Sequence, residues 1–134
     1  MIEEDFPEEL IENDEAFSCV YPVAHCAGWT TKEIKDAIEK YKENKIGGTD
    51  AGMSLRTILT TLINLPTKKS LLIFKKYAIV NDEIDPLKNK FEDILKVFAE
   101  NDVSSRDIVY LFGFPYGVDF VDILHRFEEQ HIWT

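Results

Sequence analysis

Residues 85–98 read DPLKNKFEDILKVF, and their apolar side chains recur at the spacing of an α-helix. One face of this helix would carry Leu87, Phe91, Ile94, Leu95 and Phe98. Asp85 followed by Pro86 is typical of a helix start, with aspartate as the cap and proline at the first helical position. The pattern therefore predicts an amphipathic helix that begins near Asp85, ends at Asn101 and is buried along one side.

Helix start and stop signals also lie before this stretch. Thr30 and Glu33 match a capping box, in which the two side chains bond to each other's backbone N–H groups. We expect that helix to end at Gly47-Gly48. Near the N-terminus, Pro7 can open a helix, which Pro22 is expected to interrupt.

Further helices are expected over residues 55–65, 68–80, 105–112 and 117–127. The apolar residues of the 68–80 helix are Leu71, Leu72, Phe74, Tyr77 and Ala78. Ser104 is expected to open the next helix and Gly113 to close it. Because no segment alternates apolar and polar residues with turn dipeptides, no strand is predicted.

The predicted fold is therefore all-α, with six or seven short helices in a single domain over residues 1–134. A chain of this length buries roughly two-thirds of its unfolded surface, and 45% of its residues are hydrophobic. Two arrangements stay open. We favour a compact bundle, but the expected helix starts lie about 18 residues apart, at Thr31, Thr49, Thr67, Asp85 and Val103. That spacing would also suit stacked helical hairpins, as in an α-solenoid.

The charge is strongly negative and unevenly placed. The net charge is −10, residues 1–15 carry eight acids and no base, and residues 51–80 carry five bases and no acid. Such a balance repels phosphate backbones and attracts basic proteins, so we expect a basic protein partner and no direct nucleic-acid binding. The acidic start lacks the basic and then apolar pattern of a secretory signal, and no apolar run spans a membrane. These features predict a cytoplasmic protein that does not bind membranes.

Two groups of residues could carry chemistry. His25 and Cys26 are adjacent, and adjacent side chains point in different directions, which disfavours a base–nucleophile pair. Asp122, His125 and Glu129 can share one helix face, which we interpret as solvated. We therefore predict no catalytic residue, no metal and no cofactor.

The turn from Phe112 to Gly117 carries three aromatic residues, which is unusual for an exposed connection. Aromatic side chains are favoured as interface anchors because they bury a large area at a small entropy cost. Phe112 is expected in the core, while Phe114 and Tyr116 are candidate anchors, with Trp133 as a further one. The acids least offset by neighbouring bases are the candidate rim: Glu8, Glu9, Glu12, Asp82, Glu83, Asp119 and Asp122.

These features favour a binding protein over an enzyme. In size, charge and helical content the chain is similar to bacterial toxin-immunity proteins and phage inhibitors of nucleases, although no motif carries that similarity. The prediction is an immunity or antitoxin-like inhibitor that neutralises a basic, nuclease-type toxin or effector. The alternative is a small helical adaptor, or an enzyme that uses His25 and Cys26 or Asp122 and His125.

Overall fold

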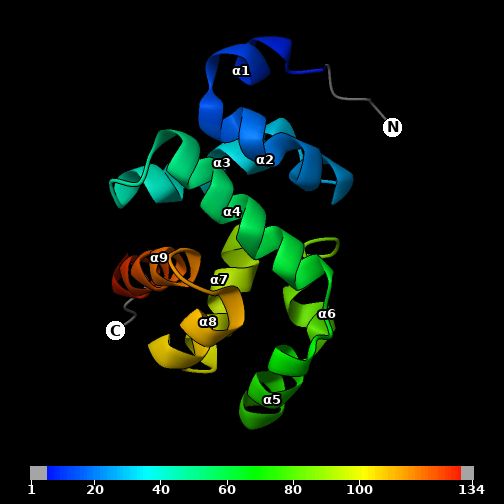
Figure 1. Ribbon diagram of the computed structural model, residues 1–134, viewed down its shortest axis with the longest axis vertical. Coiled ribbons are helices and arrows are strands. Elements are labelled where there is room, and N and C mark those ends of the chain that lie inside the picture. The colour runs from blue at the N-terminus through cyan, green and yellow to red at the C-terminus, as the bar shows by residue number, and fades with distance from the viewer. Residues whose placement is uncertain (1–5, 131–134) are drawn as a thin grey trace.

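The computed structural model describes residues 6–130, and every regular element in that range is helical (Figure 1). The helices are α1 (Glu8–Asn13), α2 (Glu15–Cys26), α3 (Thr31–Glu43), α4 (Gly48–Ile63), α5 (Lys68–Tyr77), α6 (Asn81–Ile84), α7 (Phe91–Glu100), α8 (Ser105–Phe112) and α9 (Tyr116–Gln130). The all-α class is confirmed. The described residues form nine helices, so the prediction of six or seven was too low.

The α4 helix runs through the middle of the molecule and carries much of the core (Figure 1). Its side chains Leu55, Ile58 and Leu59 are completely buried, and the helix contacts α2, α3, α8 and α9. The α9 helix also packs on α3 and α7. In a solenoid each repeat contacts only its neighbours. Contacts between helices so far apart in the chain make this a compact bundle.

Two glycines allow helices to approach closely. A Cβ atom added at Gly52 of α4 would lie 2.7 Å from the Ala16 carbonyl oxygen of α2. One added at Gly117 of α9 would lie 2.7 Å from the Cα of Val109 on α8. Such distances are shorter than any ordinary contact, so these positions exclude larger residues.

Several helix ends lie where the sequence predicts them. Thr30 accepts a hydrogen bond from the Glu33 N–H at 3.2 Å, and Glu33 accepts one from the Thr30 N–H at 2.9 Å. Ser104 caps α8 by accepting from the Asp107 N–H, and Asn101 ends α7. Side-chain oxygens thus satisfy N–H groups that the first helical turn leaves without partners.

Two predicted helix ends, at Pro22 and at Gly47-Gly48, are wrong. Pro22 does not interrupt a helix but lies inside α2, exposed, and the break falls earlier at Asp14, which caps α2. The packing of α2 on α4 compensates for the backbone bond that proline cannot make. Gly47 and Gly48 do not end α3, which already ends at Glu43, but begin α4.

The predicted start at Asp85-Pro86 is also wrong, because these residues form a turn and α7 begins at Phe91. The Asp85 side chain accepts a hydrogen bond from the Leu87 N–H at 3.0 Å, as in an Asx turn. Leu87 is consequently exposed, not buried. The Pro86 carbonyl accepts a buried hydrogen bond from Trp29 Nε1 at 2.9 Å, which fixes the turn against the α2–α3 connection.

Only some of the apolar residues of α5 are buried. Ile73 and Phe74 are buried, whereas Leu71 and Leu72 are 59% and 68% exposed. Four consecutive apolar residues go all the way round a helix, and α5 packs along only one side, mainly on α8. The sequence pattern alone could not choose which pair faces the core.

Candidate functional site

The nine residues nominated for partner binding lie on three separate parts of the fold. Glu8, Glu9 and Glu12 are exposed on α1, and Asp82 and Glu83 are exposed on α6. The last group is Phe114, Tyr116, Asp119 and Asp122, which follow one another through the α8–α9 turn into the first two turns of α9. Of the three groups, only the last combines aromatic and acidic side chains.

The aromatic turn presents one fully exposed ring. Phe112 is buried, with its ring centroid 6.0 Å from that of Phe98 and 5.0 Å from that of Phe120. Tyr116 is half-buried, and Phe114 is 81% exposed. Phe112 therefore belongs to the core, as predicted, and Phe114 is the ring available to another molecule.

Asp119 lies one helical turn beyond Tyr116 and connects this surface to the interior. The Ser54 hydroxyl of α4 acts on its carboxylate by favouring the charged form, which lowers the pKa of Asp119. Ser54 is completely buried, and its hydroxyl oxygen lies 3.4 Å from that of Tyr41 on α3, which is also completely buried. A chain of polar groups thus runs from the core at α3, through α4, to the surface at α9.

The surroundings of Asp119 disfavour its charge. Partial burial raises the pKa of Asp119 above its ordinary value, and the negative charges of Asp122 and Asp50 raise it further, while the Ser54 hydroxyl opposes the rise. Burial also raises the pKa of Tyr41, with a smaller contribution from the Asp119 charge. Asp119 therefore lies near two other carboxylates, and their negative charges oppose its ionisation.

Some other acids in residues 6–130 are paired with bases. Asp107 lies 2.9 Å from Lys76, Glu33 lies 3.2 Å from Lys90, and Asp82 lies 3.1 Å from Lys88. The expectation that Asp82 is little offset by bases is therefore wrong. Within residues 6–130, no ion pair involves Asp50, Asp119 or Asp122. We call Asp50, Phe114, Tyr116, Asp119 and Asp122 the acidic–aromatic surface.

The sequence did not single out Asp50, Ser54 or Tyr41 as parts of this site. One signal for Ser54 was present, because it lies between Ala51, Leu55 and Ile58 on the buried side of α4. A hydroxyl on a buried face must find a hydrogen-bond partner. The identity of that partner depends on how α3 and α9 pack, which the local sequence does not give.

The residues considered for chemistry remain dispersed. His25 is exposed and stacks on Tyr21 at a centroid distance of 4.9 Å, while Cys26 is an exposed free thiol. Asp122, His125 and Glu129 are exposed along α9. Among the described residues, no group of three or more His, Cys, Asp and Glu side chains could hold a metal ion. Trp133, the further anchor candidate, lies outside the described residues.

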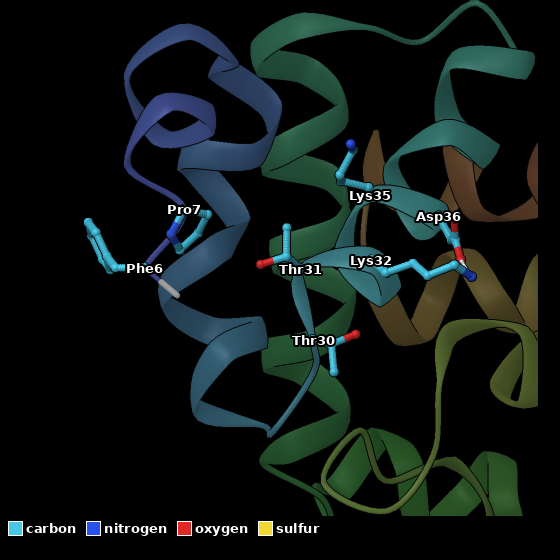
Figure 2. Close-up of a pocket in the computed structure, with 7 residues that line it drawn as sticks. All are labelled: Phe6, Pro7, Thr30, Thr31, Lys32, Lys35 and Asp36. Atoms are coloured by element: carbon cyan, nitrogen blue, oxygen red, sulfur yellow. Dashed lines mark hydrogen bonds and ion pairs between the residues drawn. The ribbon is translucent and has the colours of Figure 1, made fainter. Parts of the chain in front are cut away.

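An open pocket lies between the residues preceding α1 and the start of α3 (Figure 2). Phe6 and Pro7 form one side, and the residues from Thr30 to Asp36 form the other (Figure 2). Three of its polar residues interact within α3 or its cap, because Thr30 belongs to the capping box and Lys32 pairs with Asp36 at 3.4 Å. We therefore place no chemistry in this pocket.

No helix between residues 6 and 130 combines the length and the apolar character needed to cross a lipid bilayer. Comparisons of the chain with protein-family models, with curated proteins and with solved structures found no match.

Proposed function

We propose that this protein binds a basic protein partner through the acidic–aromatic surface and neutralises it, in the manner of an immunity protein or antitoxin. The observation that carries the proposal is the state of Asp119. This carboxylate is partly buried, its pKa is raised, and it has no basic partner among the described residues. A perturbed carboxylate of this kind is more common at functional sites than elsewhere.

The energetics of Asp119 favour a role in binding over a role in folding. At neutral pH its ionised form lowers the stability of the free protein, because burial and two neighbouring carboxylates oppose the charge. A lysine or arginine of a partner, placed against Asp119, Asp122 and Asp50, would remove that penalty only in the complex. Because the partner's positive charge would relieve the electrostatic penalty at Asp119, that relief would add to the affinity of the complex.

Phe114 supplies the apolar part of the same surface. A phenylalanine that is 81% exposed leaves most of its ring in water. An aromatic side chain buries about 150–250 Å² when covered, and such residues surrounded by polar groups often dominate interface energies. Phe114 would be the anchor, and the carboxylates of α9 would form the rim that selects a basic partner.

The charge of the chain favours a partner that acts on nucleic acids. Proteins that bind phosphate backbones do so with clustered lysines and arginines. A protein of net charge −10 is attracted to the same basic surface and, once bound, excludes the nucleic acid from it. Neutralisation would therefore occur by occlusion.

Capture from the native host tests this proposal. The wild-type chain is compared with an Asp119→Lys/Asp122→Lys variant and with a Glu39→Lys/Glu129→Lys control, which changes the net charge equally at exposed sites on α3 and α9. We expect the wild type and the control to capture the same basic protein and the first variant to lose it. Added wild-type protein should then inhibit the nucleic-acid-directed activity of the captured protein. Equal capture by all three chains, or an acidic captured protein, would refute the proposal.

A further inference from the structure

The α5 helix presents both lysines and leucines to the solvent. Leu71 and Leu72 are 59% and 68% exposed. Lys68 and Lys75 lie three or four residues from these leucines, so all four share the outward side of the helix. We call Lys68, Leu71, Leu72 and Lys75 the α5 face.

The charge of the α5 face is not neutralised locally. Lys76 pairs with Asp107 at 2.9 Å, and Lys69 lies over the Tyr110 ring, 5.2 Å from its centroid. Lys68 and Lys75 form no ion pair with any residue that the structure describes. Since residues 51–80 contain no acid, a strongly acidic protein carries here a local excess of positive charge beside two exposed leucines.

A surface of complementary character lies at the other end of the same chain. Glu8, Glu9 and Glu12 are exposed on α1 and form no ion pair within residues 6–130. Phe6, just before α1, is 67% exposed. We call Phe6, Glu8, Glu9 and Glu12 the α1 face. Figure 1 shows α1 and α5 at opposite ends of the long axis, so the two faces cannot meet within one molecule.

We infer that the α5 face of one copy docks on the α1 face of a second copy, head to tail. The lysines would face glutamates, and Leu71 and Leu72 would be covered beside Phe6. An α5–α5 contact would oppose lysines to lysines, and an α1–α1 contact would oppose glutamates to glutamates, and both are unfavourable. Because a head-to-tail contact leaves one face free at each end, it repeats along a chain of copies unless it closes into a ring.

This contact is separate from the acidic–aromatic surface on α9. It can therefore fail while the proposed partner binding stands, and the reverse also holds. It would also cover the acids of α1, leaving the carboxylates near α9 as the acidic surface available to a different protein.

Sedimentation of the purified protein alone is the first measurement. At high protein concentration and about 0.01 M salt, the weight-average mass should exceed the monomer mass of 15.5 kDa. It should fall to that value near 1 M salt, where the screening length drops from about 30 Å to about 3 Å. A protein that is monomeric at every salt concentration would overturn the inference.

Charge reversal then identifies the two faces. Lys68→Glu/Lys75→Glu and Glu8→Lys/Glu12→Lys should each weaken association by about tenfold or more. A mixture of the two variants should associate again, because each supplies a face complementary to the other. The Glu39→Lys/Glu129→Lys control should associate like the wild type, and Leu72→Ala should weaken association without changing any charge.

Three other outcomes would overturn the inference, because each would show that the α5 face does not bind the α1 face of a second copy. Loss of association in the α5 variant alone would indicate a contact that does not use α1. Loss in both variants without recovery on mixing would indicate that the faces do not meet. Binding of monomeric protein to phosphatidylserine vesicles, abolished by Lys68→Glu/Lys75→Glu, would make an anionic lipid surface the occupant of the α5 face.

Discussion

The hydroxyl oxygen of Ser54 on α4 lies 3.4 Å from that of Tyr41 on α3, and neither residue is exposed to solvent. Ser54 also acts on the carboxylate of Asp119 on α9, where its hydroxyl favours the charged form. Removing the Ser54 hydroxyl should therefore affect both the stability of the fold and the pKa of Asp119.

Ser54→Ala should lower the free energy of unfolding by about 1–3 kcal/mol, because the Tyr41 hydroxyl would be left buried without its partner. Tyr41→Phe made in the Ser54→Ala background should restore part of that loss, since removal of both partners is less costly than removal of one. Urea denaturation of the two single variants and the double variant measures this coupling. Strictly additive losses would show that the two hydroxyls do not interact.

The pH dependence of Asp119→Asn should reveal the penalty carried by this carboxylate. Because burial and like charges raise the pKa of Asp119 in the folded protein, the folded chain binds the proton more tightly than the unfolded chain. Ionisation at neutral pH therefore lowers stability, and asparagine at this position should raise it. The advantage should vanish as the pH falls below about 3.9, where the aspartate is protonated in both states.

Asp107→Asn is the matched control, for which we expect the opposite change in stability at neutral pH. Hydrogen bonds from Tyr77 and Lys76 lower the pKa of Asp107, so its charge stabilises the folded protein. The substitution should therefore destabilise the protein at neutral pH, by about 1 kcal/mol for a partly exposed pair. Denaturation curves from acid to neutral pH that show the same sign for both variants would contradict the assignment of Asp119.

Gly52→Ala should destabilise the protein although alanine is the better helix former. The added methyl would lie 2.7 Å from both the Ala16 carbonyl oxygen and the Cys19 Cβ, and overpacking of this kind costs about 1–3 kcal/mol. Gly47→Ala is the control, since nothing lies within 4 Å of a Cβ at that position and its φ is negative. Thermal melting should separate the two variants clearly, and equal melting temperatures would argue against the close packing of α2 on α4.

The exposure of Leu72 on α5 can be tested by comparing the stability of a buried and an exposed leucine variant. Leu59→Ala, at a completely buried position of α4, should cost about 2–5 kcal/mol. Leu72→Ala, at a residue that is 68% exposed, should change the stability of the monomer by no more than about 0.5 kcal/mol. Denaturation at high salt, where self-association is suppressed, makes this comparison. A large loss in Leu72→Ala would mean that α5 packs on its other side.

Local signals in the sequence predicted those parts of the fold that local physics determines. The capping box of Thr30 and Glu33 and the cap at Ser104 depend on residues three positions apart, and both form as predicted. The predicted break at Pro22 does not form, because proline disfavours an isolated helix, whereas α2 is held by its packing on α4. Asp85-Pro86 satisfies the rules for a helix start, but these residues form a turn. The Pro86 carbonyl in that turn accepts a buried hydrogen bond from Trp29, a distant contact that local signals do not reveal.

The candidate site shows the same division. Phe114, Tyr116, Asp119 and Asp122 could be nominated together because they are close in the chain. The contribution of Ser54 and Asp50 could not be predicted from the sequence, because it depends on how α4 packs against α9. The separation of Glu8 and Glu83 from Asp119 is likewise a property of the packing, which charge counted along a sequence cannot give.

The association rate constant for the basic protein captured from the native host tests the proposed function most directly. Long-range attraction sets this rate, and it is screened over about 8–10 Å at ordinary salt. We predict that Asp119→Lys/Asp122→Lys slows association and flattens its dependence on salt, while Phe114→Ala or Tyr116→Ala mainly speeds dissociation, by tenfold for each ~1.4 kcal/mol lost. Glu39→Lys/Glu129→Lys should keep most of the wild-type rate. Association that is unchanged by reversal of Asp119 and Asp122, or that becomes faster as salt is raised, would contradict the proposal.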